Sequence, residues 1–101
     1  METGVEIISD ERTRQITDEG YTSEMDDNQS CGELALAAAC YAVPYYLRDS
    51  KDGSILPWPW NPKYYKPNKS PDKTGEGRIH ELAKAGALIA AEIGRLERLN
   101  K

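Results

Sequence analysis

The chain has 101 residues, of which 30% are charged, and a net charge of −4. This length predicts a single domain, residues 1–101, that leaves much of its surface wet and would gain from a core shared with a partner subunit. The acidic balance argues against binding to duplex nucleic acid, whose affinity comes mainly from neutralised phosphates. Bases outnumber acids only in residues 60–101, which leaves room for a small anionic ligand.

The cysteine pattern and the apolar runs restrict the location of the protein. Cys31 and Cys40 have no CxxC partner and no histidine at metal-ligand spacing, so we expect reduced core residues. No apolar run approaches the roughly 18 residues that span a bilayer, and the acidic start lacks a signal-peptide core. We therefore expect a cytoplasmic protein without a membrane partner.

The first third of the chain predicts a modest helix and a polar turn. Residues 4–19 carry sparse apolar positions among charges, which predicts an amphipathic helix that has one buried edge and stops at Gly20. These apolar positions are Val5, Ile8 and Ile16. Residues 20–30 are polar, and Thr22 or Ser23 can cap a short helical turn there.

Residues 31–46 predict a second helix. The sequence CGELALAAACYAVPYY is apolar on nearly every face, which is typical of a helix surrounded by others. Ser30 and Glu33 match a capping box at its start. Pro44 should kink or end the helix, because proline lacks a backbone donor and clashes with the preceding turn.

Residues 47–74 are predicted to form a long loop. They contain five prolines and both tryptophans and have no helical or alternating period. Long loops inside a compact domain are usually functional or disordered, and so many aromatic side chains are costly to leave in water. The fold class that follows is a small all-α bundle with an ordered aromatic loop between the second and last helices.

The last helix, about Gly75 to Leu99, carries a heptad pattern. Its spacing of three and four predicts an apolar seam, and a second face of small residues lies beside it. The seam is Ile79, Leu82, Gly86, Ile89, Ile93 and Leu96. We expect a homo-oligomer, dimer or tetramer, that forms through this seam or the alanine face. His80, the only histidine, has no nucleophile in catalytic order and is expected on the surface.

Carboxylates from two helices form one candidate site. Oxygen ligands brought together in this way are what Mg²⁺ requires. The set is Asp26, Asp27, Glu33, Glu81 and Glu92. The alternative interpretation is that these side chains only cap a helix, solvate a loop and form surface ion pairs.

Several motifs together resemble a widespread family of small phage and prophage proteins. They are ERTRQ (11–15), EGYT (19–22), Asp26 with Asp27, GELALAAACYA (32–42), WPW (58–60), YYKP (64–67) and KAGALIAAEIGRLER (84–98). The resemblance covers most of the chain. Members are loosely described as similar to the N-terminal part of a dATP/dGTP diphosphohydrolase, a label that fixes no activity by itself.

The GEL motif (32–34) is also similar to that of the all-α MazG-type nucleotide pyrophosphohydrolases. Those enzymes place two glutamates before GEL and an ExxD set on a following helix. Here Gln29 and Ser30 occupy the region before the motif, and Glu81 is followed three residues later by Lys84. Because a lysine repels a metal ion, the resemblance implies a nucleotide-binding scaffold that has lost its metal cluster and holds no cofactor.

The aromatic loop and the start of the last helix form the second candidate site. Aromatic faces stack on nucleobases, whereas basic side chains and a helix N-terminus bind phosphate. The predicted ligand-binding residues are Trp58, Trp60, Tyr64, Tyr65, Lys66, Arg78 and Lys84. The alternative interpretation is that the aromatic side chains only anchor the loop over the alanine-rich helices, and both interpretations can hold together.

The leading functional hypothesis is a phage or prophage accessory protein that binds a nucleotide or cyclic nucleotide without turnover. Such a protein would hold a host anti-phage defence signal out of circulation in the host cytoplasm. One alternative is a MazG-like, Mg²⁺-dependent nucleoside triphosphate pyrophosphohydrolase that uses Asp26, Asp27, Glu33 and Glu92. Another is an inhibitor that docks its aromatic loop on a host enzyme.

Overall fold

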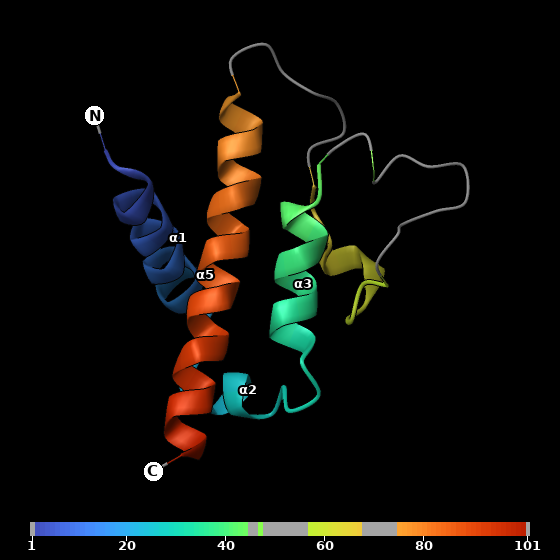
Figure 1. The fold of residues 1–101 in the computed structure, drawn as a ribbon. Helices are drawn as coiled ribbons and strands as arrows, with labels where there is room; N and C mark the ends of the chain where they lie inside the picture. Colours follow the sequence, from blue (N-terminus) through green and yellow to red (C-terminus); the bar gives the residue numbers. More distant parts are fainter. Residues whose placement is uncertain (1, 45–46, 48–56, 68–74, 101) are drawn as a thin grey trace.

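A computed structural model of the chain describes residues 2–44, 47, 57–67 and 75–100. These residues form helices and no strand, which confirms the predicted all-α fold. In chain order the elements are α1 (Gly4–Asp18), α2 (Ser23–Asp27), α3 (Glu33–Ala42), the 3-10 turn η1 (Pro62–Tyr64) and α5 (Glu76–Leu99). Figure 1 shows α5 running the length of the molecule with α1 on one side and α3 on the other.

The apolar core lies between α3 and α5. Most of its buried side chains are alanines, which let the two helix backbones approach closely while still removing apolar surface from water. The buried cluster is Leu34, Ala37, Ala38, Tyr41, Ala85, Leu88 and Ala91. Within α3 only Ala35 and Ala42 are exposed, and the other eight residues are buried or intermediate. The prediction of a helix covered on nearly every face therefore agrees with the structure except at these two alanines.

The edge by which α1 packs differs from the predicted one. Val5 and Ile16 are exposed, whereas the polar side chains of Glu11 and Gln15 are buried. The apolar contact comes from Ile8, whose Cδ1 would lie 2.6 Å from a Cβ added at Gly86 of α5. The predicted apolar edge is therefore correct for Ile8 and wrong for Val5 and Ile16, because the inner side of α1 also holds Glu11 and Gln15, which accept from Arg14 and Arg12.

The start of α1 and the turn that follows it agree with the sequence. Thr3 and Glu6 form a capping box, in which each side chain accepts a hydrogen bond from the other's backbone amide. Gly20 has φ +72°, a left-handed conformation that favours glycine, and it follows directly on the end of α1. Thr22 then caps α2 by accepting from the Met25 amide.

Helix α3 is shorter at both ends than the helix predicted over residues 31–46. Its N-cap is Gly32 with φ +82°, so Ser30 does not cap it, and the Glu33 carboxylate instead accepts from the Cys31 amide at 2.6 Å. The helix ends at Ala42, just before Pro44, as its ring requires. Residues 45 and 46, which were also expected to be helical, lie outside the described residues. Cys31 is exposed rather than part of the core, whereas Cys40 is buried, and neither forms a disulfide.

The last helix confirms the prediction and presents its seam to solvent. α5 covers Glu76–Leu99, and no described helix is both long and apolar enough to cross a membrane. The large seam residues are 42–53% exposed, and they are Ile79, Leu82, Ile89, Ile93 and Leu96. His80 is exposed as expected.

Two glycines of α5 provide a matched test of the α1–α5 contact. Gly94→Ala should raise the free energy of unfolding by about 0.5–1 kcal/mol, because alanine favours helix and the new Cβ meets only the flexible end of Arg98. Gly86→Ala should instead lower it by about 1–3 kcal/mol, since the Cβ overlaps Ile8. Urea unfolding measures both, and equal stabilisation by the two substitutions would contradict the packing.

Candidate functional site

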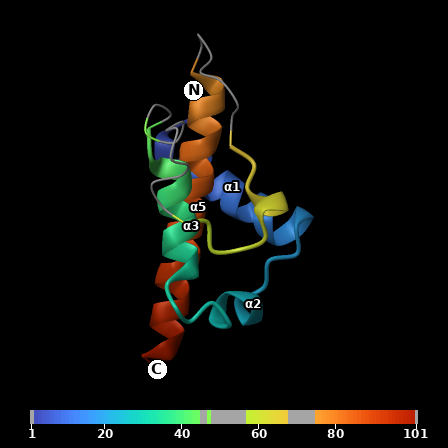
Figure 2. The same ribbon diagram turned by 90° about the vertical axis from the view of Figure 1, so that its right-hand side faces the viewer.

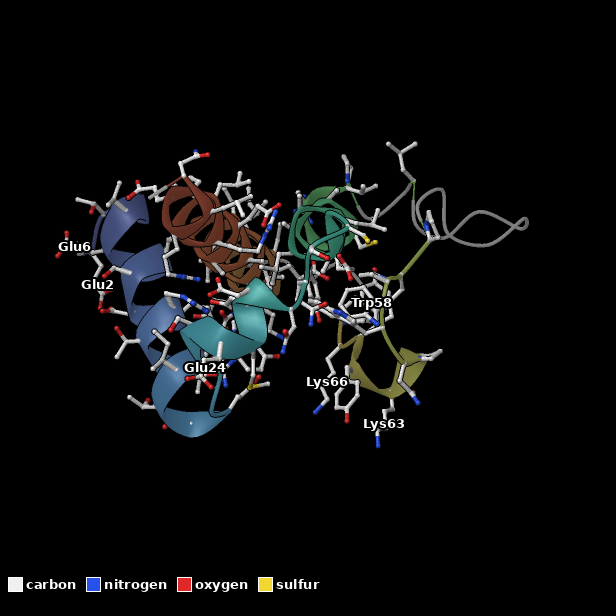
Figure 3. All side chains as sticks on the ribbon, turned by 90° about the horizontal axis from the view of Figure 1, so that it is seen from below. Glu2, Glu6, Glu24, Trp58, Lys63 and Lys66 are labelled. Atoms are coloured by element: carbon white, nitrogen blue, oxygen red, sulfur yellow. The ribbon has the colours of Figure 1, made fainter. Side chains whose placement is uncertain are left out.

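The segment 57–67 is fixed to the core by an aromatic cluster. The Trp58 ring lies 4.7 Å from that of Tyr65 and 5.6 Å, edge-on, from that of Tyr41 on α3. Trp60 packs edge-on against Trp58 at 5.4 Å between ring centroids. Figure 3 shows Trp58 between the segment and α3, while Lys63 and Lys66 extend from the segment on the side away from α3.

Hydrogen bonds complete this attachment. The Trp60 indole donates to the Gln29 side-chain oxygen at 2.9 Å, and the Lys66 amide donates to the Tyr41 hydroxyl at 3.1 Å. The side chain of Tyr64 takes no part and is 56% exposed. The anchoring interpretation therefore describes Trp58 and Tyr65, and Tyr64 is an aromatic face that remains accessible.

A cavity of about 380 Å³ lies between this segment and the C-terminal half of α1. Its floor is Lys84 and Leu88 of α5, and it is within the size range of small-molecule sites. Figure 2 shows the opposing walls, with the segment that carries η1 passing beside the end of α1. The lining residues are Glu11, Arg14, Gln15, Glu19, Tyr21, Tyr41, Trp58, Trp60, Tyr64, Lys66, Lys84 and Leu88.

A second cavity of about 560 Å³ adjoins the first on the side of α2. The two share the side chains of Glu19, Tyr21, Trp60 and Tyr64, so they form one groove with two compartments. The second compartment adds Met25 and Leu34, the Asp26 carboxylate and the carboxamides of Gln29 and Asn61, and it lacks the basic residues of the first. The first compartment thus carries charges of both signs, whereas the second combines aromatic and apolar side chains with two carboxylates and two carboxamides.

The charged side chains of the first compartment differ in whether they already form ion pairs within the protein. Arg14 donates to both Glu11 oxygens at 2.7 and 2.8 Å and to Glu19 at 2.9 Å, so its charge is already shared between two carboxylates. Lys84 donates to the Lys66 carbonyl at 3.3 Å, and its ammonium stands 5.4 Å from the Tyr41 ring centroid. Within the described part of the chain, neither Lys66 nor Lys84 has a carboxylate partner.

The pKa shifts agree with this picture. Burial lowers the pKa of Lys84; the Glu11 and Glu19 carboxylates partly offset this lowering, and the charges of Arg14 and Lys66 add to it. Burial, together with the neighbouring Glu19 carboxylate, raises the pKa of Tyr21 to about 12. The Tyr21 hydroxyl therefore stays protonated at neutral pH, and an anion in direct contact with the partly buried Lys84 would further favour its charged form.

The structure brings together most of the predicted ligand-binding residues. Five of them line the first compartment, namely Trp58, Trp60, Tyr64, Lys66 and Lys84. Tyr65 and Arg78 do not line it. The Arg78 guanidinium donates to the carbonyls of Tyr41, Ala42 and Val43 and to Glu81, so it satisfies the free carbonyls at the end of α3.

The predicted carboxylate set is separated into ion pairs. Asp26 pairs with Arg12 at 2.6 Å and Asp27 with Arg98 at 2.8 Å. The remaining three carboxylates also have partners, which are Arg95 for Glu92, Arg78 for Glu81 and the Cys31 amide for Glu33. The described residues contain no group of three or more potential ligands placed to hold a metal ion.

Several lining residues were not predicted from the sequence. Glu11, Gln15 and Glu19 recur every four residues, which places them on one face of α1, and Arg14 stands beside them. That polar repeat within an amphipathic helix was the available signal. Tyr21 enters the groove because Gly20 turns the chain back, and its backbone amide bonds to the Gln15 carbonyl at 3.1 Å.

Comparison with known proteins identifies no relative. No family model matches the chain, and neither curated proteins nor solved structures give a match.

The two roles of the aromatic side chains can be separated by stability. Trp58→Ala should lower the free energy of unfolding by roughly 3–5 kcal/mol, because it removes the centre of the aromatic cluster. Tyr64→Ala should change it by less than about 0.5 kcal/mol, since that side chain is exposed. Chemical denaturation followed by circular dichroism measures both, and comparable losses would refute the division of roles.

Proposed function

We propose that this chain binds a nucleotide in the groove between α1 and the segment 57–67 and does not turn it over. The observation that carries the proposal is the combination of accessible aromatic faces with two lysines that lack carboxylate partners in the described structure. Stacking on an aromatic side chain contributes roughly 1–3 kcal/mol per base and tolerates any base. Lysine supplies the charge that a phosphate requires.

The two compartments suit the two ends of a nucleotide. The phosphate would occupy the first compartment, near Lys66 and Lys84. The base would lie in the second compartment against Tyr21, Trp60 or Tyr64. Both compartments share these aromatic side chains, so the ribose would lie at the boundary between them.

The resemblance to small phage and prophage proteins extends the proposal to a biological role. A protein that binds a nucleotide or cyclic nucleotide without turnover can hold a host defence signal out of circulation in the host cytoplasm. That role requires tight binding and an intact ligand. Calorimetry measures the binding, and recovery of the unchanged nucleotide after incubation shows that it stays intact.

The Mg²⁺-dependent pyrophosphohydrolase receives less support from the described residues. It needs carboxylates that converge on a metal ion, whereas Asp26, Asp27 and Glu92 each bond to an arginine. An arginine at a carboxylate competes with a cation for the same oxygens. Incubation with Mg²⁺ and a panel of nucleoside triphosphates distinguishes the two functions, because only the enzyme releases pyrophosphate.

Two neighbouring lysines test the proposed binding site. Lys66→Ala should weaken nucleotide binding by roughly 1–3 kcal/mol, because it removes a charge that lines the first compartment. Lys63→Ala is the matched control, since Lys63 lies over the outer ring face of Tyr64 and lines neither compartment. Isothermal titration calorimetry with mono-, di- and cyclic nucleotides measures both, and equal losses would indicate only general charge attraction.

We further propose that the exposed face of α5 joins two or more copies of the chain. Five large apolar side chains at heptad spacing face solvent there. Lys84 and Leu88 lie on the opposite side of the same helix, as its 3.6-residue period requires. Assembly through the seam would therefore leave the groove open.

Ile89→Asp should convert the assembled protein into a monomer of 11.3 kDa, because an unpaired charge in the contact is costly. The fold should survive, since Ile89 is 48% exposed within one copy. Val5→Asp is the control, because Val5 is more exposed and lies on α1. Light scattering at tens of micromolar measures the mass, and a monomeric wild type would refute assembly.

A further inference from the structure

Gln15 has an unusual environment for a buried side chain. It is 4% exposed and lines the first compartment. Its side-chain oxygen accepts from the Arg12 guanidinium at 3.4 Å. Arginine has only donors, so the oxygen of the carboxamide must face Arg12 and the nitrogen must point elsewhere.

The Arg12 side chain is itself held in place. Its other terminal nitrogen donates to the buried Asp26 carboxylate at 2.6 Å. Arg12, held by Asp26 of α2, therefore fixes the oxygen end of the Gln15 carboxamide. The Gln15 side-chain nitrogen meets no acceptor among the described residues. A buried donor without an acceptor costs free energy, and an acceptor atom of a ligand would remove that cost.

The charge of the compartment indicates what kind of acceptor fits. Three cations and two carboxylates line it, which leaves a net charge of +1 at neutral pH. Gln15 adds a donor without adding charge. A singly charged phosphodiester would neutralise the compartment, whereas a phosphomonoester, whose second pKa is near 6, would bring a second negative charge toward Glu11 and Glu19.

We propose that Gln15 contacts the ligand and that its side-chain nitrogen, with Lys84, selects a phosphodiester over a phosphomonoester dianion. The inference rests on the proposed nucleotide binding and specifies which class of nucleotide the groove takes. Arg12 and Asp26 act as positioning residues, because they orient Gln15 without lining the first compartment.

The first experiment replaces Gln15 and measures stability and affinity together. Gln15→Met keeps the side-chain length and removes both the donor and the oxygen that accepts from Arg12. We expect adenosine 3′,5′-cyclic monophosphate to bind about tenfold more weakly, the equivalent of one charge-assisted hydrogen bond. The melting temperature of the free protein should stay within about 2 °C of the wild type, because the lost donor had no partner among the described residues, the lost contact with Arg12 is long at 3.4 Å, and Arg12 keeps its bond to Asp26. Gln15→Glu should weaken binding further, since it adds a negative charge.

The second experiment changes the ligand charge and leaves the protein unchanged. Adenosine 5′-monophosphate and its methyl phosphate ester have the same base and sugar, and neither has a cyclic phosphate. At pH 7.5 the two differ by one negative charge. We expect the ester to bind at least about tenfold more tightly. Adenosine serves as the uncharged reference and should bind more weakly than the ester.

The outcomes separate this inference from the proposed function. If the wild type binds no nucleotide, the proposed function fails and the phosphodiester selection fails with it. If nucleotides bind but Gln15→Met leaves their affinity unchanged, or the monophosphate binds as tightly as its ester, nucleotide binding stands and the role of Gln15 is refuted. A large drop in the melting temperature of Gln15→Met would show that Gln15 is structural and would also overturn the inference.

Discussion

The close approach of α3 to α5 is the constraint on which the rest of the structure depends. Alanines on both helices let the backbones come together, and the resulting core is thin because it contains few large side chains. The aromatic cluster around Trp58 extends that core on one side, and Arg78 closes the end of α3 with three backbone hydrogen bonds. The segment 57–67 can form one wall of a groove only because it rests on this pair of helices.

Arginine–carboxylate ion pairs attach α2 to its neighbouring helices. α2 is a single short turn, and it is attached to α1 through Arg12 and to α5 through Arg98. The acidic residues before α3 are therefore structural components whose oxygens are already engaged. Arg14 has the same effect on α1, where it pairs with two carboxylates, whereas the two lysines of the groove form no ion pair with a described residue.

Elements with a strong period or a clear terminator could be predicted from the sequence. The heptads of α5 and the turn at Gly20 are examples, because their signals are local. Only one side of the groove, the aromatic and basic residues of the segment 57–67 together with Lys84, could be predicted from the sequence. Its lysines and aromatic residues stand out in composition, but the contribution of α1 depends on which polar side chains face inward. Arg78 shows the limit most clearly, since a basic residue near a helix N-terminus suggests phosphate, and only the fold shows that α3 carbonyls occupy it.

The position of the tryptophans has a practical consequence. The sequence contains two, and both line the first compartment of the groove. Their indoles are also in edge contact with each other. Tryptophan fluorescence from this protein therefore originates entirely at the groove, with no background from indoles elsewhere in the chain. A molecule that enters the compartment changes the polarity around the emitting rings, so the unlabelled protein carries its own optical probe of occupancy.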